Sequence, residues 1–301
     1  MRSDKKILIL VVTKRCNLRC AHCQVEKSNT NMNFETAWRA VSLFLGKNDS
    51  SQRPLIRFFG GEPLLNFEVI RRIVNRTQKR YANVDFDLVT NGLLLDRKKV
   101  DFFQKRPNLK LIVSSVRKEI FSSRLFLNIC TRLPSLVVTI NLLPGKTDSA
   151  KSIFVDLSGK GIRRFKFLPA YYVKWSLKEI RSLRKCFDEM RKVIASAKTR
   201  IRLENLEQKN QVPLHSSALT VDCNGDVYFG NYFLDRHIRK YGNMLKLGNV
   251  HNLADWRAVS DFPLNIDPKY ILKRTFPEEI LKITMKVDRT LTEFLINVAK
   301  K

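Results

Sequence analysis

Short apolar segments alternate with amphipathic helical patterns between residues 7 and 168. The apolar segments have the length and the branched and aromatic content of buried β-strands. We predict six of them, at 7–12, 55–59, 86–90, 109–114, 136–142 and 162–168. Between the first strands, one predicted helix has Phe34, Trp38, Val41 and Leu45 on one face, and the next has Val69, Ile70, Ile73 and Val74. Strand-helix-strand units build parallel sheets, so the sequence predicts an α/β fold.

A longer helix is predicted to begin after Ser176. Ser176 and Glu179 have the spacing of a capping box, in which each side chain binds the other residue's backbone N–H. The apolar face of this helix consists of Leu177, Ile180, Leu183, Phe187, Met190 and Ile194, and its other face is mostly Lys and Arg.

Cys16, Cys20 and Cys23 have the spacing C-x-x-x-C-x-x-C just after the first predicted strand. Three thiolates on one short loop form a metal site that lacks its fourth protein ligand. An open coordination position distinguishes a reactive centre from a structural one. A structural zinc site is the alternative, but it usually needs four protein ligands. His22 directly precedes Cys23, and neighbouring side chains in a tight loop rarely converge on one ion.

Gly60-Gly61-Glu62-Pro63 follows the second predicted strand. Two glycines let the backbone approach a ligand closely, and the carboxylate beside them can accept hydrogen bonds from an ammonium group. The alternative is a surface turn. Because parallel strands end at the same edge of a sheet, this segment, the cysteine loop and Asn91-Gly92 are predicted to lie at one site.

The segment from Thr13 to Cys23 and the Gly-Gly-Glu-Pro segment resemble the corresponding motifs of radical SAM enzymes. The resemblance implies that Cys16, Cys20 and Cys23 hold one 4Fe-4S cluster, whose free iron binds S-adenosylmethionine. It also implies a set of residues that contact this cofactor: His22, Gly60, Gly61, Glu62, Pro63, Asn91, Ser114 and Asn141. Glu62 would accept hydrogen bonds from the methionyl amine. The six units would form a partial (β/α)6 TIM-like barrel.

The resemblance further implies an activity. A reduced flavodoxin or ferredoxin would supply an electron, and cleavage of the cofactor would give a 5'-deoxyadenosyl radical that removes hydrogen from a substrate. The resemblance does not extend to the substrate. Where close relatives usually have Ser-Leu-Asp-Gly after the fourth strand, this chain has Ser114-Ser115-Val116-Arg117. Arg117 meets an anionic substrate in one interpretation and is an exposed charge in the other.

Residues 219–256 are similar to the SPASM or twitch extension of enzymes that modify peptides and proteins. The segment 219–229 predicts a hairpin with Asn224-Gly225 as its turn. Gly230 stands where the family has a cysteine, and no cysteine follows it, so we predict no auxiliary cluster. Cys130, Cys186 and Cys223 are predicted to be packed or surface thiols. The predicted domains are a barrel at 1–210, the extension at 211–256 and a helical segment at 257–301.

The formal net charge is +28, from 56 Lys and Arg against 28 Asp and Glu. Such a charge attracts nucleic acid, acidic peptides or an acidic electron donor. The densest basic stretches are 71–80 and 178–198, but no helix-turn-helix, zinc-finger or stacked-aromatic RNA motif accompanies them. Solvated helix faces are the alternative interpretation. The apolar run at 7–12 is too short to cross a bilayer, so we expect a cytoplasmic protein without a membrane partner.

Three hypotheses therefore stand at this point. The first is a radical SAM enzyme acting on a peptide or protein. The second is such an enzyme acting on RNA. The third, from another class, is a basic nucleic-acid-binding protein whose cysteine loop holds structural zinc.

Overall fold

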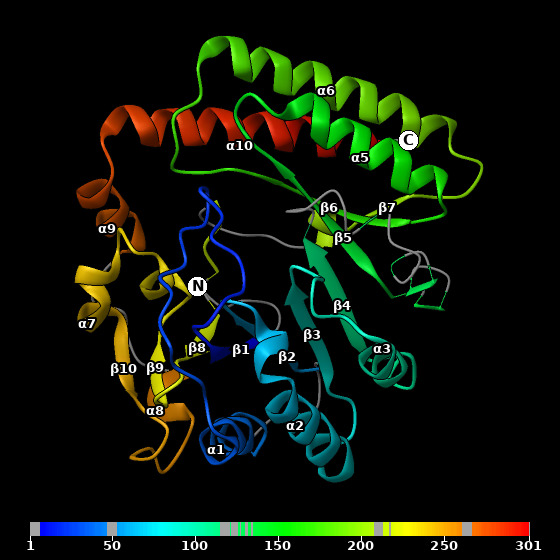
Figure 1. Ribbon diagram of the computed structural model, residues 1–301. Coiled ribbons are helices and arrows are strands. Elements are labelled where there is room, and N and C mark those ends of the chain that lie inside the picture. Colours follow the sequence, from blue (N-terminus) through cyan, green and yellow to red (C-terminus); the bar gives the residue numbers. More distant parts are fainter. Residues whose placement is uncertain are drawn as a thin grey trace. The chain divides into compact units, whose positions relative to one another are not determined.

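The computed structural model describes residues 7–46, 53–114, 135–207, 213–216, 218–260 and 267–300, together with a few positions between 121 and 133 (Figure 1). The chain forms two compact units. The first consists of residues 1–90, 106–111 and 215–275, and the second of residues 91–105, 112–214 and 276–301.

The first unit contains strands in the order β10-β9-β8-β1-β2-β3. Their bounds are β1 Ile7–Thr13, β2 Leu55–Gly60, β3 Asp85–Thr90, β8 Leu219–Val221, β9 Asp226–Tyr228 and β10 Lys246–Asn249. β1 pairs in parallel with β2 and with β8, and β2 pairs in parallel with β3. The pairs β8-β9 and β9-β10 are antiparallel.

The helices of the first unit are α1 Phe34–Leu45, η1 Pro63–Asn66, α2 Phe67–Arg80, η4 Tyr232–Leu234, η5 Arg239–Tyr241, α7 Gly242–Leu245, α8 Arg257–Ser260 and α9 Pro268–Thr275. α1 begins at a regular cap, because the Asn33 side chain accepts a hydrogen bond from the N–H of Thr36 at 2.8 Å. α1 packs against α2 and β1. Both helices bury the apolar faces that the sequence predicts, although Trp38 and Val69 are only partly buried.

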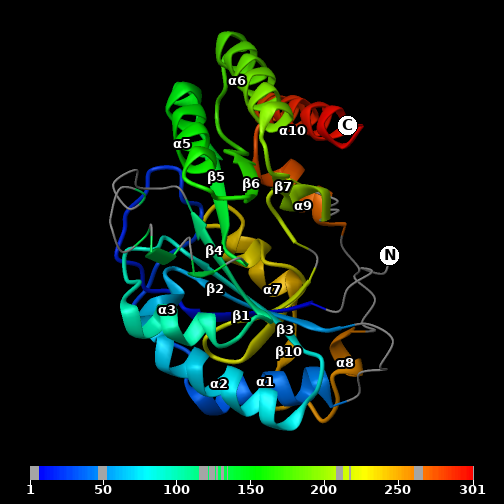
Figure 2. The ribbon, with the colours of Figure 1, turned by 90° about the vertical axis from the view of Figure 1, so that its right-hand side faces the viewer.

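The second unit contains the parallel strands β4 Leu109–Ser114, β5 Val137–Leu142, β6 Arg164–Pro169 and β7 Arg202–Leu203, with the unit boundary inside β4. Its helices are α3 Arg97–Gln104, α5 Thr147–Gly159, α6 Leu177–Ser196, η3 Glu204–Glu207 and α10 Glu278–Ala299. α6 lies beside both α5 and α10 (Figure 2). Five buried rings join these helices to β6, with neighbouring centroids 4.6–6.0 Å apart: Phe154, Phe165, Phe167, Phe187 and Phe294.

The predicted α/β class and all six predicted strands are confirmed, with ends that shift by one or two residues. The capping box is confirmed as well, because the N–H of Glu179 donates to Ser176 Oγ and the N–H of Ser176 donates to Glu179 Oε2. Leu177, which the helical spacing places on the apolar face, is not part of the buried face. It is 61% exposed, because it is the first residue of α6 and the buried face of the helix begins at Ile180.

The hairpin predicted at 219–229 is confirmed as β8 and β9, and Gly225 has the positive φ that its turn requires. The predicted domain limits at residues 210 and 256 stay predictions. The contacts within the structure group residues 215–275 with residues 1–90. None of the described helices combines the length and the apolar character that a bilayer crossing needs.

Candidate functional site

The loop that carries the three cysteines is closed at its base by backbone hydrogen bonds. The returning segment runs beside the end of β1. The N–H of Lys14 donates to the carbonyl of Thr30 at 2.9 Å, and the N–H of Ser28 donates to the carbonyl of Lys14 at 3.2 Å. One step further in, the N–H of Met32 donates to the carbonyl of Val12 at 2.9 Å. Residues 15–27, called the cysteine loop below, therefore have fixed ends.

Cys16, Cys20 and Cys23 are each partly exposed. The N–H of Cys23 donates to the carbonyl of Cys20 at 3.1 Å, so the second half of the motif is a tight turn. Among the described residues, no three His, Cys, Asp or Glu side chains lie close enough together to hold a single metal ion. This finding concerns a mononuclear site, because a cubane cluster distributes its protein thiolates over separate iron atoms. Three soft sulfur ligands on one loop fit an iron-sulfur cluster.

The Gly60-Gly61 segment lies directly against the start of the cysteine loop. The N–H of Gly61 donates to the carbonyl of Thr13 at 2.9 Å, and the N–H of Glu62 donates to the carbonyl of Arg15 at 2.7 Å. A Cβ atom on Gly60 would stand 2.0 Å from the Thr13 oxygen, and one on Gly61 would stand 2.1 Å from the Arg15 oxygen. The two glycines therefore permit the close approach of the backbone at Thr13 and Arg15, whereas the sequence predicts the close approach of a ligand.

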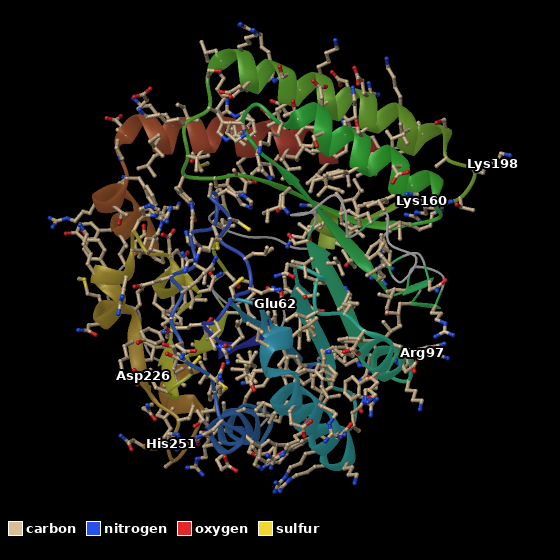
Figure 3. The ribbon with its side chains drawn as sticks, viewed as in Figure 1. Glu62, Arg97, Lys160, Lys198, Asp226 and His251 are labelled. Carbon is tan, nitrogen blue, oxygen red and sulfur yellow. The ribbon has the colours of Figure 1, made fainter. Side chains whose placement is uncertain are left out.

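Glu62 is a buried carboxylate at the start of η1, 1% exposed (Figure 3). Its Oε1 accepts hydrogen bonds from the N–H of Leu64 at 3.0 Å and from the hydroxyl of Thr90, the last residue of β3, at 2.7 Å. Both of these donors are neutral. They orient the carboxylate beside the cysteine loop, so this position suits the recognition of a cationic group.

Asn91, Ser114 and Asn141 belong to the second unit. The amide of Asn141 donates to the hydroxyl of Ser114 at 2.8 Å, which joins the carboxyl-terminal parts of β5 and β4. The side chain of Asn91 accepts a hydrogen bond from the N–H of Leu93 at 3.0 Å and forms a local turn. Arg117 and Cys130 lie outside the described residues.

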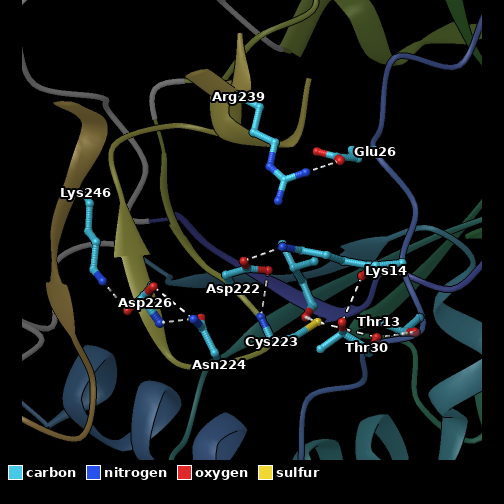
Figure 4. A network of polar contacts seen from close by, with 12 residues as sticks. Thr13, Lys14, Glu26, Thr30, Asp222, Cys223, Asn224, Asp226, Arg239 and Lys246 are labelled. Carbon is cyan, nitrogen blue, oxygen red and sulfur yellow. Dashed lines mark hydrogen bonds and ion pairs between the residues drawn. The ribbon is translucent and has the colours of Figure 1, made fainter. Parts of the chain in front are cut away.

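Residues of the predicted extension contact Lys14, directly before the cysteine loop, and Glu26, near the end of the loop (Figure 4). Lys14 Nζ lies 2.5 Å from Asp222 Oδ2, and Glu26 forms an ion pair with Arg239. The backbone adds to the second contact, because the N–H of Glu26 donates to the carbonyl of Leu234 and the N–H of Arg236 donates to the carbonyl of Gln24, both at 2.9 Å. Sequence reasoning missed these partners. Lys14 and Asp222 are 208 positions apart, and no local pattern links them.

Cys223 is packed against the end of β1 and is a buried thiol, which is one of the two predicted alternatives. Its Sγ donates to the carbonyl of Val11 at 3.1 Å. Burial raises the pKa of the Cys223 thiol to about 12, so it stays protonated at neutral pH. Next to it, Asp226 binds Lys246, Asn249 and Asn224 at 2.8–2.9 Å. Although burial opposes ionisation, these partners lower the pKa of Asp226 and fix the hairpin turn as a charged network.

We expect Asp222→Asn to lower the free energy of unfolding by about 1–3 kcal/mol, because it leaves the partly buried Lys14 ammonium without its charged acceptor. Urea denaturation measures this change. The control is Glu293→Gln, which breaks the half-exposed pair with Arg184 and should cost less than about 1 kcal/mol. Equal midpoints for Asp222→Asn and the unaltered chain would contradict a stabilising role of this contact.

Three comparisons with known proteins bear on the site. Residues 10–119 match the sequence profile of the Radical SAM superfamily. An uncharacterized protein of Methanocaldococcus jannaschii, MJ0907, is 41% identical over 101 residues, which are 33% of this chain and 34% of that protein. The GTP 3',8-cyclase of Clostridium acetobutylicum is 31% identical over 175 residues, which are 50% of this chain and 52% of that enzyme. The structure is similar to that of anSMEcpe with bound AdoMet and the Cp18Cys peptide, with a TM-score of 0.74 and 16% identity over 98% of both chains.

The chain thus spans about a third and about half of the length of these two curated relatives. At 16% identity, the likeness to anSMEcpe shows a shared fold. The sequence match is more specific, because the cysteine loop and the segment Gly60–Pro63 both lie inside residues 10–119.

Proposed function

We propose that the chain is a radical SAM enzyme whose Cys16, Cys20 and Cys23 hold one 4Fe-4S cluster, because residues 10–119 match the profile of the Radical SAM superfamily. The observation that carries the proposal is the closed cysteine loop, with the N–H groups of Gly61 and Glu62 bonded to Thr13 and Arg15 at its start. When bound, the cluster and S-adenosylmethionine supply a one-electron reductive cleavage that yields a 5'-deoxyadenosyl radical. A reduced flavodoxin or ferredoxin is the proposed electron donor.

The chain's own residues then have distinct proposed roles. The three thiolates bind iron, and Glu62 accepts hydrogen bonds from the methionyl ammonium group. The remaining proposed contacts to the cofactor come from His22, Gly60, Gly61, Pro63, Asn91, Ser114 and Asn141. The contacts from the extension keep the cysteine loop in one conformation, which pre-organises the three thiols.

The proposed substrate is a peptide or protein. Support comes from the fold shared with anSMEcpe over almost the whole chain, since the structure of that protein holds a bound peptide. A purine nucleotide is the second candidate, and the similarity to a GTP 3',8-cyclase favours it. Incubation of the reduced enzyme with GTP distinguishes the two candidate substrates. A cyclised GTP product would support the nucleotide, and unchanged GTP would support the peptide or protein.

Metal analysis of protein purified without oxygen tests the enzyme itself. We expect about four irons per chain, and methionine and 5'-deoxyadenosine as products when a reductant and S-adenosylmethionine are added. Zinc without iron, and no cleavage, would overturn the proposal in favour of a structural zinc site.

Replacing Glu62 by glutamine is expected to weaken the binding of S-adenosylmethionine by roughly 10- to 100-fold while leaving the iron content unchanged. A hydrogen bond between charged groups contributes about 1.5–3 kcal/mol, and the neutral amide loses most of it. Equilibrium dialysis with the labelled cofactor measures the affinity. Glu35→Gln, at an exposed carboxylate in the first turn of α1, is the matched control. An unchanged affinity in Glu62→Gln would contradict the proposal that Glu62 binds the methionyl ammonium group.

A further inference from the structure

One face of α2 carries five exposed cations. The residues are Arg71, Arg72, Arg76, Lys79 and Arg80, called the α2 basic face below. The helix has one carboxylate, Glu68, and it pairs with Arg71 at 2.7 Å. Among the described residues, no ion pair involves Arg72, Arg76, Lys79 or Arg80. Most of this positive charge therefore has no ion-pair partner in the part of the first unit that the structure describes.

Aromatic rings lie under three of these guanidinium groups. Arg72 Cζ stands 3.7 Å from the centroid of the Phe34 ring, and Arg76 Cζ stands 4.5 Å from that of Trp38. Arg80 Cζ lies 5.7 Å from the ring centroid of Tyr81. A ring that lies under a guanidinium fixes its plane by a cation-π contact. The ring accepts no hydrogen bonds from the N–H groups, which point outward in the plane of the guanidinium. The stacked arginines are thus pre-organised donors that lack acceptors of matching charge.

The spacing of these arginines indicates the shape of the partner. Arg72, Arg76 and Arg80 are each four residues apart, so they form one stripe with steps of about 6 Å along the helix axis. Successive phosphates along a nucleic-acid strand have a comparable separation. A guanidinium also matches phosphate with two parallel hydrogen bonds, whereas an ammonium acts as a point charge.

The position of the stripe argues against an electron donor as the partner. The cysteine loop bonds to Gly61 and Glu62, which precede the start of α2. Arg80 is the last residue of this 14-residue helix, roughly 20 Å from its start. Arg80 therefore lies at the end of α2 that is far from the segment bonded to the cysteine loop.

The basic helix α6 of the second unit provides a contrast. Arg184 pairs with Glu293, and Glu179 and Glu189 intersperse the cations along the helix. Among the described residues, no aromatic ring lies under a cation of α6. Its charge suits a solvated face, which was the alternative interpretation for both basic stretches.

We propose that the α2 basic face binds the phosphate backbone of a nucleic-acid strand, with Arg72, Arg76 and Arg80 as the principal contacts. The proposal does not depend on the radical SAM activity, since none of these residues belongs to the proposed cofactor site. It gives a function to a small part of the chain's excess positive charge.

Fluorescence anisotropy with a labelled oligouridylate tests the proposal with the full chain. We expect the triple variant R72Q/R76Q/R80Q to weaken binding by about 10-fold or more and to reduce the salt slope of log K by about 2, as three lost phosphate contacts require. The control K178Q/R181Q/K185Q removes the same charge from α6 and should change affinity by less than about 3-fold. A deoxythymidylate probe of equal length distinguishes DNA from RNA.

A second variant distinguishes the effect of the stacked arrangement of the arginines from the effect of their charge. Trp38→Leu keeps every cation but removes the nearer of the two rings beside Arg76, so we expect affinity to fall by about 3-fold, as for the loss of one cation-π contact. Equal losses in the two triple variants would overturn the proposal, because binding would then follow net charge. Preferential binding of poly-glutamate over the oligouridylate at equal charge would overturn it in favour of an acidic protein. Circular dichroism and iron content verify that each variant is folded and that the cofactor site is intact.

Discussion

Cys20→Ala is expected to abolish both iron binding and the cleavage of S-adenosylmethionine. With Cys20 replaced, the cysteine loop offers two thiolates, and no other described side chain is placed to complete the set. A cluster bound by two protein ligands is not retained, because thiolate donors hold it in the protein. Iron analysis, absorption spectroscopy and the yield of 5'-deoxyadenosine measure the loss. The variant should still fold, since Cys20 is partly exposed and contributes little to the core.

The matched control is Cys186→Ala, which removes a cysteine from the buried face of α6. Burial raises the pKa of the Cys186 thiol to about 12, so this residue supplies no thiolate at neutral pH. We expect full iron content and full cleavage, at a stability cost of about 1 kcal/mol for the small cavity. Cleavage that persists in Cys20→Ala would contradict the assignment of the cluster to this loop, whatever the control shows.

The strands and the motifs could be predicted because their signals are local. An apolar run bounded by turn residues predicts a buried strand, and three cysteines in one register predict a shared ligand. Six strands, the capping box at Ser176 and the hairpin turn at Gly225 follow from such short-range patterns. Leu177 shows where the pattern fails, because a residue with helical spacing is exposed when it precedes the first packed turn.

The support around the cysteine loop could not be predicted from the sequence. Lys14 and Glu26 are ordinary surface-type residues in a basic chain, and their partners Asp222 and Arg239 lie more than two hundred positions away. Only the fold brings them together. The sequence shows that Gly230 replaces a cysteine of the family. It does not show that Asp222 of the same extension binds Lys14, or that the backbone of Leu234 binds Glu26 of the cysteine loop. Energetic coupling between distant segments leaves no periodic trace in a single sequence.

Gly61→Ala is expected to destabilise the protein before any cofactor binds. The new methyl group would stand 2.1 Å from the carbonyl oxygen of Arg15, a backbone atom that cannot move without displacing the start of the cysteine loop. Overpacking of this kind costs about 3 kcal/mol, and the hydrogen bond from Glu62 to Arg15 would be strained at the same time. Urea denaturation of the metal-free protein measures the stability, and reconstitution afterwards measures the loss of iron.

Gly159→Ala is the control for the same chemical change. Gly159 ends α5, and a Cβ atom there meets nothing within 4 Å, so the substitution should leave stability unchanged or raise it by up to about 1 kcal/mol. Because the denaturation is done without metal, a cost seen only in Gly61→Ala assigns the glycine to packing against the cysteine loop. Unaltered stability in Gly61→Ala, combined with weaker binding of S-adenosylmethionine, would contradict this role. Gly61 would then serve to let the ligand approach the backbone closely, as the sequence alone predicts.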